Sequence, residues 1–145
     1  MDEMKLAKNL IKKYNTNNPF EICDYLNYIV IQTPLTGVRG FYQFFEKNNI
    51  IYVDKDLDCH IKNFVCAHEL GHSIMHKGTN EIFMDTRTFL KTSIYERQAD
   101  KFAVNFLYPD DSLFIDLKDY TVGQISRYLY LDENVVMYRI SEIKK

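Results

Sequence analysis

The chain has 145 residues, 46% of them hydrophobic, and its 18 basic and 20 acidic residues give a formal net charge of −2. This length suits one domain, and the 11 tyrosines and 10 phenylalanines supply apolar surface for a core. Because the charge is nearly balanced and the lysines are dispersed, the composition argues against binding to nucleic acid or to an anionic membrane. No apolar run reaches membrane-spanning length, no signal-peptide pattern opens the chain, and the three cysteines fit reduced thiols. We therefore expect a single domain over residues 1–145, located in the cytoplasm.

Two helices and a small sheet are predicted in the first half of the chain. Apolar residues at helical spacing over 7–14 indicate a first helix, and residues 18–21 have the cap, proline and acid that begin a second. Residues 28–31 form a predicted buried strand, and 41–45 with 50–53 form a predicted hairpin. The expected fold class is α+β, with a short antiparallel sheet packed on the helix that follows.

That next helix is expected from about residue 59 to residue 77, with Asp58 as its N-cap and Gly78 as its stop. Residues 68–72 read His-Glu-Leu-Gly-His, the H-E-x-x-H pattern of zinc-dependent hydrolases. Side chains four residues apart on an α-helix share one face, so one metal ion can bind both imidazoles. Glu69 projects beside that site, and we predict that it is the general base that takes a proton from metal-bound water. Two histidines placed by chance on a surface helix are the alternative, but apolar residues surround the motif at helical spacing.

A catalytic zinc site needs a third protein ligand besides His68 and His72. Glu96 is the favoured ligand because Asp100 lies one helical turn later and faces the same way. A metal-bound histidine usually donates its other ring N–H to a carboxylate, so Asp100 is the predicted partner behind one of the two imidazoles.

Three other interpretations compete with this assignment. Ser93 and Glu96 also form a capping-box pattern, in which Glu96 would only satisfy the helix N-terminus. Glu81 and Asp85 are rival third ligands, but neither has a carboxylate one turn later.

His76 follows His72 by one further turn, and capping of the helix end is a simpler role for it than metal binding. The residue that stabilises the oxyanion of the reaction stays open between His76, Tyr95 and Tyr108.

Residues 121–129 and a second helical pattern after Asp132 resemble a helix-turn-helix. The second helix presents few basic side chains, so we interpret residues 111–145 as a packing element or a repressor-docking surface. Direct reading of DNA is not expected.

The chain resembles the ImmA/IrrE-type metallopeptidases of bacteria, mobile elements and phages. The likeness rests on residues 67–76 (AHELGHSIMH) and 96–103 (ERQADKFA), followed by 106–109 (FLYP), and extends over most of residues 37–110. It implies a small zincin-like metallopeptidase domain, with residues 37–110 as its catalytic core. In metallopeptidases resembling this one, a strand near the active-site helix often holds an extended substrate, and the predicted hairpin is the candidate for that role.

By this resemblance His68, His72 and Glu96 match the family's metal ligands, and Glu69 matches its catalytic glutamate. The resemblance also implies a protein substrate, because many members cleave or inactivate a helix-turn-helix repressor and so switch on stress or mobile-element genes. The expected cofactor is Zn²⁺, although histidine and carboxylate ligands also permit Mn²⁺ or another divalent ion. A non-hydrolytic regulator that binds a repressor or a toxin–antitoxin partner is the chief alternative, and a zinc-dependent transcription factor is the second.

Overall fold

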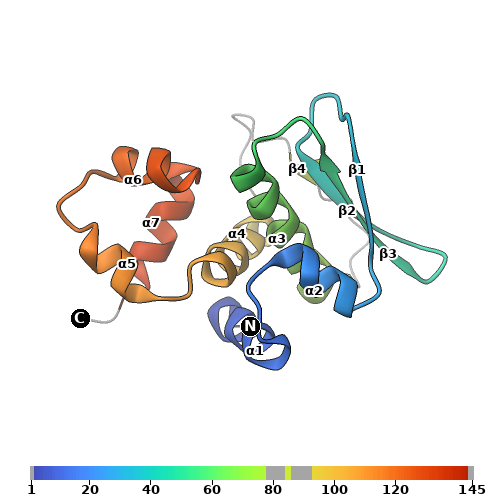
Figure 1. Ribbon diagram of the computed structural model, residues 1–145, viewed down its shortest axis with the longest axis horizontal. Coiled ribbons are helices and arrows are strands. Elements are labelled where there is room, and N and C mark those ends of the chain that lie inside the picture. Colours follow the sequence, from blue (N-terminus) through green and yellow to red (C-terminus); the bar gives the residue numbers. More distant parts are fainter. Residues whose placement is uncertain (1, 78–83, 86–92, 144–145) are drawn as a thin grey trace.

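The computed structural model describes residues 2–77, 84–85 and 93–143. Within these ranges the helices are α1 (Glu3–Tyr14), α2 (Pro19–Tyr25), α3 (Cys59–Met75), α4 (Ile94–Leu107), α5 (Asp111–Asp116), α6 (Val122–Leu129) and α7 (Glu133–Ser141). The strands are β1 (Ile29–Thr33), β2 (Gly40–Phe45), β3 (Asn48–Asp54) and β4 (Met84–Asp85). Helix α3 lies between the sheet and α4, and α5, α6 and α7 form a group on the far side of α4 (Figure 1). The α+β fold class is thereby confirmed.

The sheet has the strand order β1-β3-β2-β4 and is mixed. Strands β2 and β3 form the predicted hairpin, and β4 pairs antiparallel with the start of β2. Strand β1 pairs parallel with β3, so the expectation of a purely antiparallel sheet is wrong at this pair. The chain reverses direction between β1 and β2 and again between β2 and β3. Strands β1 and β3 therefore run in the same direction and pair in parallel. Because β3 lies between β1 and β2, it offers no free edge to a substrate.

One face of the sheet packs on α3 through a very close contact. Ile51 and Val53 of β3 are fully buried in the core, as is Val65 of α3. A Cβ on Gly40 would lie 2.5 Å from Cγ1 of Val65 and 2.6 Å from the carbonyl oxygen of Tyr52. Only a glycine lets β2 approach α3 and β3 at this distance, so the sheet and the helix are held in one fixed relation.

Helix α3 also packs closely on α4. At Gly71, an added Cβ would lie 2.9 Å from Cδ1 of Phe102, whose ring is fully buried. The helix begins after Asp58, whose side chain accepts a hydrogen bond from the His60 amide at 2.9 Å. It ends at Met75, two residues earlier than predicted, with His76 as C-cap; the predicted stop, Gly78, lies outside the described residues.

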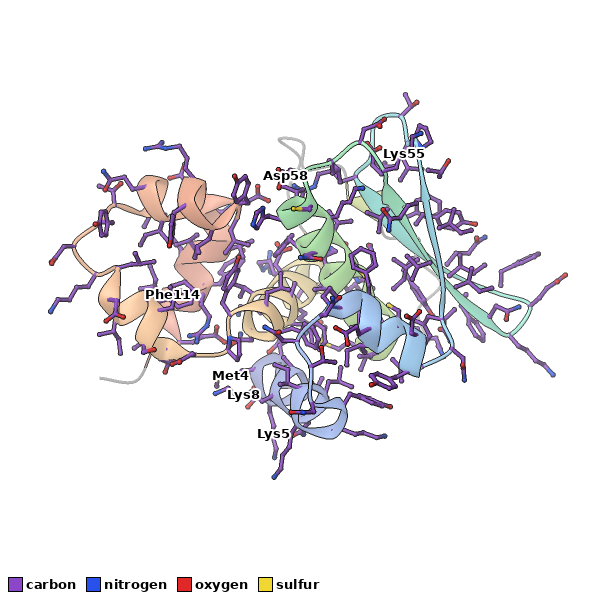
Figure 2. The ribbon with its side chains drawn as sticks, in the orientation of Figure 1. Met4, Lys5, Lys8, Lys55, Asp58 and Phe114 are labelled. Carbon is purple, nitrogen blue, oxygen red and sulfur yellow. The ribbon has the colours of Figure 1, made fainter. Side chains whose placement is uncertain are left out.

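The C-terminal helices are joined to the end of α4 by Arg139 of α7, whose side chain is fully buried. Its guanidinium donates to the carbonyl oxygens of Tyr108 and Pro109 and forms a 2.6 Å ion pair with Asp111. It also lies 4.9 Å from the centroid of the Phe114 ring, which is placed inside this group of helices (Figure 2). Since a buried cation must be paired and hydrogen-bonded, these contacts fix how α5 and α7 meet α4.

Helices α6 and α7 form the predicted helix-turn-helix-like pair. Thr121 and Gln124 form a reciprocal capping box at the start of α6, and Tyr130 ends the helix in the left-handed conformation. The side chain of Arg139, a cation of α7, is buried against α4 and α5 and cannot contact DNA. The docking role of this segment stays a prediction. None of the described helices is long and apolar enough to cross a lipid bilayer.

A Gly71→Ala variant should be less stable than the wild type because the new methyl group meets the buried Phe102 ring. Overpacking of this kind costs about 1–3 kcal/mol, more than the roughly 1 kcal/mol gained from the higher helix propensity of alanine. The free energy of unfolding, measured by urea titration, checks this. Gly123→Ala is the matched control, because the atom nearest to its added Cβ is 3.8 Å away and its stability should hold or rise. Equal stability changes in the two variants would contradict the close packing.

Candidate metal centre

Helix α3 presents its two motif histidines to the protein interior. Both His68 and His72 are 0% exposed, and their Nε2 atoms lie 3.2 Å apart. One turn of helix separates the two residues, which is why the rings emerge from one face. The predicted pairing of the two imidazoles therefore holds in the folded chain.

Helix α4 brings a carboxylate to the same two nitrogens. Oε2 of Glu96 lies 3.1 Å from Nε2 of His68, and Oε1 lies 2.7 Å from Nε2 of His72. The backbone amide of Glu96 donates to the Ser93 side chain at 3.2 Å, so Ser93 caps α4. Glu96 therefore has two separate contacts. Its backbone amide takes part in the helix cap, while its carboxylate faces the two imidazoles.

Asp100 lies behind His68, one helical turn after Glu96. Its Oδ1 is 2.8 Å from Nδ1 of His68, and its side chain is nearly fully buried. The ring of His68 is consequently held between two carboxylates, with Nδ1 toward Asp100 and Nε2 toward Glu96. This is the partner arrangement that the sequence predicted.

The two imidazole nitrogens and the carboxylate fit the donor set of a zinc ion. Donors about 2.0–2.1 Å from a tetrahedral zinc ion are separated from one another by about 3.3 Å. The observed separations are 3.2 Å between the two imidazole nitrogens, and 3.1 and 2.7 Å from these nitrogens to the carboxylate. The separation between the two nitrogens matches this value, and each nitrogen faces a different oxygen of Glu96 at a shorter distance. A donor set of two imidazoles and one carboxylate also suits a catalytic rather than a fully closed zinc site.

Burial and charge shift the protonation of these groups in opposite directions. Burial opposes the charged form of His68, but the hydrogen bonds and charges of Asp100 and Glu96 outweigh it and raise the pKa of His68 to about 10. Burial lowers the pKa of His72 to about 4, despite the neighbouring carboxylate of Glu96. Burial raises the pKa of Glu96, yet the interactions with His68 and His72 prevail and hold this pKa well below its ordinary value. The pKa values of His68 and His72 thus shift in opposite directions because only His68 has a second carboxylate, that of Asp100, beside its ring.

Glu69 lies beside the two histidines and is fully buried. One of its carboxylate oxygens and one ring nitrogen from each of His68 and His72 all lie within 4.8 Å of one another. The predicted base therefore lies close to the predicted ligands.

Residues around this cluster resolve some of the open alternatives. His76 is the C-cap residue of α3, and its ring nitrogens are 2.8 Å from Nδ1 of His72 and 2.8 Å from Oε1 of Gln98. His76 thus lies at the end of the helix as predicted, and its ring contacts a side chain of α3 and one of α4. The ring of Tyr95 packs edge-on against His76, with centroids 4.8 Å apart. Tyr108 lies 12 residues beyond Glu96, about 18 Å along α4, and its hydroxyl donates to a carbonyl of the C-terminal segment.

The rival third ligands are not brought to this cluster by anything that the structure describes. Glu81 lies outside the described residues. For Asp85 the structure describes the backbone, which pairs with Gly40 at the sheet edge. Gln98 was missed by the sequence reasoning, because residues two apart on a helix do not share a face and nothing in the spacing pairs it with Glu96.

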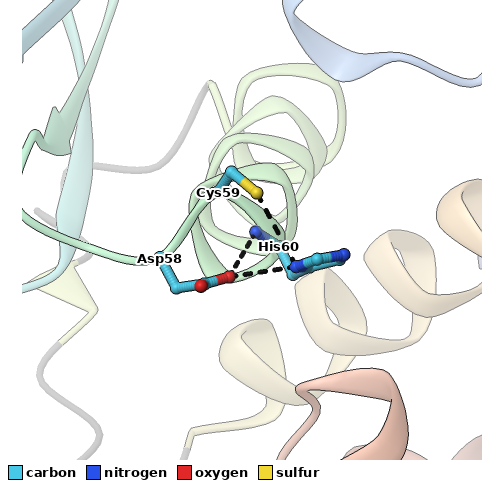
Figure 3. Close-up of side chains that lie close together, drawn as sticks. All are labelled: Asp58, Cys59 and His60. Carbon is cyan, nitrogen blue, oxygen red and sulfur yellow. Dashed lines mark hydrogen bonds and ion pairs between the residues drawn. The ribbon is translucent and has the colours of Figure 1, made fainter.

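A second cluster of potential ligands lies at the start of α3, where Asp58, Cys59 and His60 are close together and exposed (Figure 3). Oδ1 of Asp58 is already the cap of the helix and lies 3.0 Å from Nδ1 of His60. Sγ of Cys59 lies 3.7 Å from that same nitrogen. A catalytic triad requires the acid and the nucleophile on opposite nitrogens of the ring, so this cluster cannot act as one. Its position at the positive end of a helix also disfavours a cation.

Without metal, the stability of the protein should be greatest near pH 6.5. The raised pKa of His68 contributes stability that is complete below its unfolded value of 6.5 and is lost as the pH rises toward 10. The lowered pKa of His72 contributes stability that is complete above 6.5 and is lost as the pH falls toward 4. Urea unfolding in the presence of a chelator, at several pH values, measures both limbs of this profile: the alkaline limb, above pH 6.5, and the acid limb, below pH 6.5.

Asp100→Asn isolates the alkaline limb. An amide still accepts the hydrogen bond of His68 but carries no charge, so stability should fall less steeply between pH 6.5 and 10 in this variant. The acid limb should keep its slope. An alkaline limb identical to that of the wild type would contradict the role of the Asp100 charge.

The chain is similar to known proteins over most of its length. The chain matches the peptidase family described as "IrrE N-terminal-like domain" over residues 23–141. "Uncharacterized immunity region protein 2" of Bacillus phage phi105 is 41% identical over 105 residues, which cover 72% of this chain and slightly less than two thirds (66%) of the phage protein. "Metallopeptidase ImmA" of Bacillus subtilis is 29% identical over 142 residues, which cover 94% of this chain and 83% of that protein. The chain belongs to the ImmA/IrrE family of metallopeptidases.

Proposed function

We propose that the protein is a zinc-dependent endopeptidase. In this proposal His68, His72 and Glu96 bind the metal, Glu69 is the general base, and Asp100 orients His68. The convergence of one carboxylate and two imidazole nitrogens within 2.7–3.2 Å of one another carries the proposal. Such a set of like acceptors, brought together away from solvent, is expected where a cation binds.

When bound, a zinc ion supplies Lewis acidity, which polarises the scissile carbonyl and lowers the pKa of a coordinated water toward about 7. Glu69 accepts the proton of the attacking water, because its carboxylate lies close enough to the two histidines for one water molecule to bridge the gap. The same carboxylate then returns the proton to the departing amine. Tyr95 is the proposed residue for stabilising the oxyanion, since it precedes Glu96 in the chain and packs on His76, whose two ring nitrogens already face His72 and Gln98.

The choice of zinc rests on the donor set. Two imidazoles and one carboxylate suit Zn²⁺, and the same nitrogen and oxygen ligands also accept Mn²⁺ or another divalent ion. No thiol takes part, although Cys66 lies only two residues before His68. Its side chain points to the core, 3.9 Å from the sulfur of Cys23, and both residues are buried.

The proposed substrate is a helix-turn-helix transcriptional repressor, whose cleavage would derepress mobile-element or stress genes. Support comes from the similarity to a phage protein named for an immunity region and to the metallopeptidase ImmA. The C-terminal segment adds a surface suited to docking, because Tyr120 and Tyr128 line one hollow and, like Met137 of α7, are more than half exposed. A protein partner is better suited to such a surface than DNA, since aromatic residues and methionine are enriched at protein interfaces.

We further propose that residues 1–145 act as one domain in the cytoplasm. The buried core runs from Ala7 and Ile51 through α3 and α4 to Val136 of α7 as one hydrophobic cluster. The three cysteines are free thiols, which fits a reducing compartment.

Glu69→Gln should remove peptide-bond cleavage but keep the metal. The amide cannot accept a proton, and loss of a general base typically costs about 10²–10⁴-fold in rate. The zinc-loaded wild type and the variant are incubated with the helix-turn-helix repressor encoded nearest to the gene, and products are identified by intact-mass spectrometry. Cleavage by the variant would sink the mechanism. Stable association of the wild type without cleavage would favour the non-hydrolytic regulator instead.

Glu96→Ala should weaken zinc binding, because it removes a proposed metal ligand. The loss should exceed the roughly 10–100-fold that is typical when a residue hydrogen-bonded to a metal ligand is removed. The measurement is competition with a chromophoric chelator. Glu21→Ala is the matched control, because it removes an acid from the same first-turn position of α2, remote from the histidines. An unchanged zinc affinity in Glu96→Ala would show that this residue only supports the helix start.

A further inference from the structure

A chain of three hydrogen-bonded side chains leads away from the ligand cluster on the side opposite Asp100. Nδ1 of His72 lies 2.8 Å from Nδ1 of His76, and Nε2 of His76 lies 2.8 Å from Oε1 of Gln98. His76 comes from the end of α3 and is 5% exposed, while Gln98 comes from the second turn of α4. These contacts therefore join the same two helices that carry the metal-binding residues.

The last member of the chain sets its direction. An amide oxygen can only accept, so Nε2 of His76 must carry the hydrogen and donate it to Gln98. A neutral imidazole has one N–H, so Nδ1 of His76 is left as the acceptor. Nδ1 of His72 must then be the donor at the 2.8 Å contact, and its Nε2 carries a lone pair instead of a hydrogen.

That lone pair points to the place where a cation is needed. Nε2 of His72 lies 2.7 Å from a carboxylate oxygen of Glu96, and two acceptors repel one another at this distance. A positive ion between them removes the repulsion. The tautomer dictated by Gln98 is therefore the one in which His72 can bind a metal.

We propose that His76 and Gln98 are positioning residues that lock His72 in its Nδ1–H tautomer, so that its Nε2 faces the metal. This inference rests on the proposed metal centre. His68 is held by the carboxylate of Asp100, whereas His72 is held by a neutral relay ending in an amide. The two proposed ligands thus differ in their partners. The carboxylate of Asp100 makes His68 the more basic metal ligand. The neutral relay orients His72 without adding another charge to a buried site that already contains three carboxylates.

A purely structural role is the alternative, in which His76 and Gln98 only pack the end of α3 on the start of α4. Gln98→Met and Gln98→Glu distinguish the two roles. Methionine keeps the approximate size of glutamine but cannot accept the hydrogen bond, whereas glutamate restores an acceptor at the same place. Zinc affinity, measured by chelator competition, should fall about 10–100-fold in Gln98→Met and return to within about 3-fold of the wild type in Gln98→Glu. Gln32→Met, at an exposed position of β1, is the control and should leave the affinity unchanged.

The tautomers are read directly from long-range ¹H–¹⁵N spectra of the zinc-loaded wild type. His72 should show a protonated Nδ1 and His76 a protonated Nε2. A protonated Nδ1 on His76 would overturn the proposal even if every Gln98 variant failed to fold. Equal zinc affinity in wild type and Gln98→Met, or an equal loss in Gln98→Met and Gln98→Glu, would also overturn it. A wild type that binds no zinc would instead refute the metal centre itself, and the relay with it.

Discussion

Gly71 lets the ring of Phe102 pack directly on the backbone of α3, and this contact sets the distance between the two helices that build the site. The histidines come from α3, and Glu96 and Asp100 come from α4, so no group of the centre is correctly placed unless the helices meet at this spacing. Gly40 fixes the other side of α3 against the sheet in the same way. Close packing on both faces makes α3 a rigid support, because interiors at crystal-like density do not yield to small displacements.

The rigid support matters because the site is costly to fold. His68, Glu69 and His72 are fully buried, and Asp100 almost so, in surroundings where an unpaired charge or polar group carries a large desolvation penalty. Pairing offsets much of this cost, because His68 lies between two carboxylates and Nδ1 of His72 is hydrogen-bonded to His76. The three carboxylates and two imidazoles together carry more negative charge and more lone pairs than the N–H groups around them can satisfy. A divalent cation bound among them therefore stabilises the folded protein.

Much of this arrangement could be predicted from spacing alone. The four-residue separation of His68 and His72, and of Glu96 and Asp100, dictates shared helix faces, and the structure places all four side chains together. Two features lay beyond such reasoning. The parallel pairing of β1 with β3 depends on which side of the hairpin β1 joins, and alternation within a strand does not specify that. The contact of His76 with Gln98 depends on how the end of α3 crosses α4, and no single-helix periodicity encodes a crossing.

X-ray absorption spectroscopy of the zinc-loaded protein tests the central claim most directly, because it identifies the atoms bound to the ion. The account predicts nitrogen and oxygen neighbours at about 2.0–2.1 Å, with the multiple-scattering signature of two imidazoles and no sulfur. The exposed cluster at the start of α3 contains Cys59 and a single histidine. A sulfur neighbour at about 2.3 Å, or only one imidazole, would place the metal there and contradict the centre built from His68, His72 and Glu96.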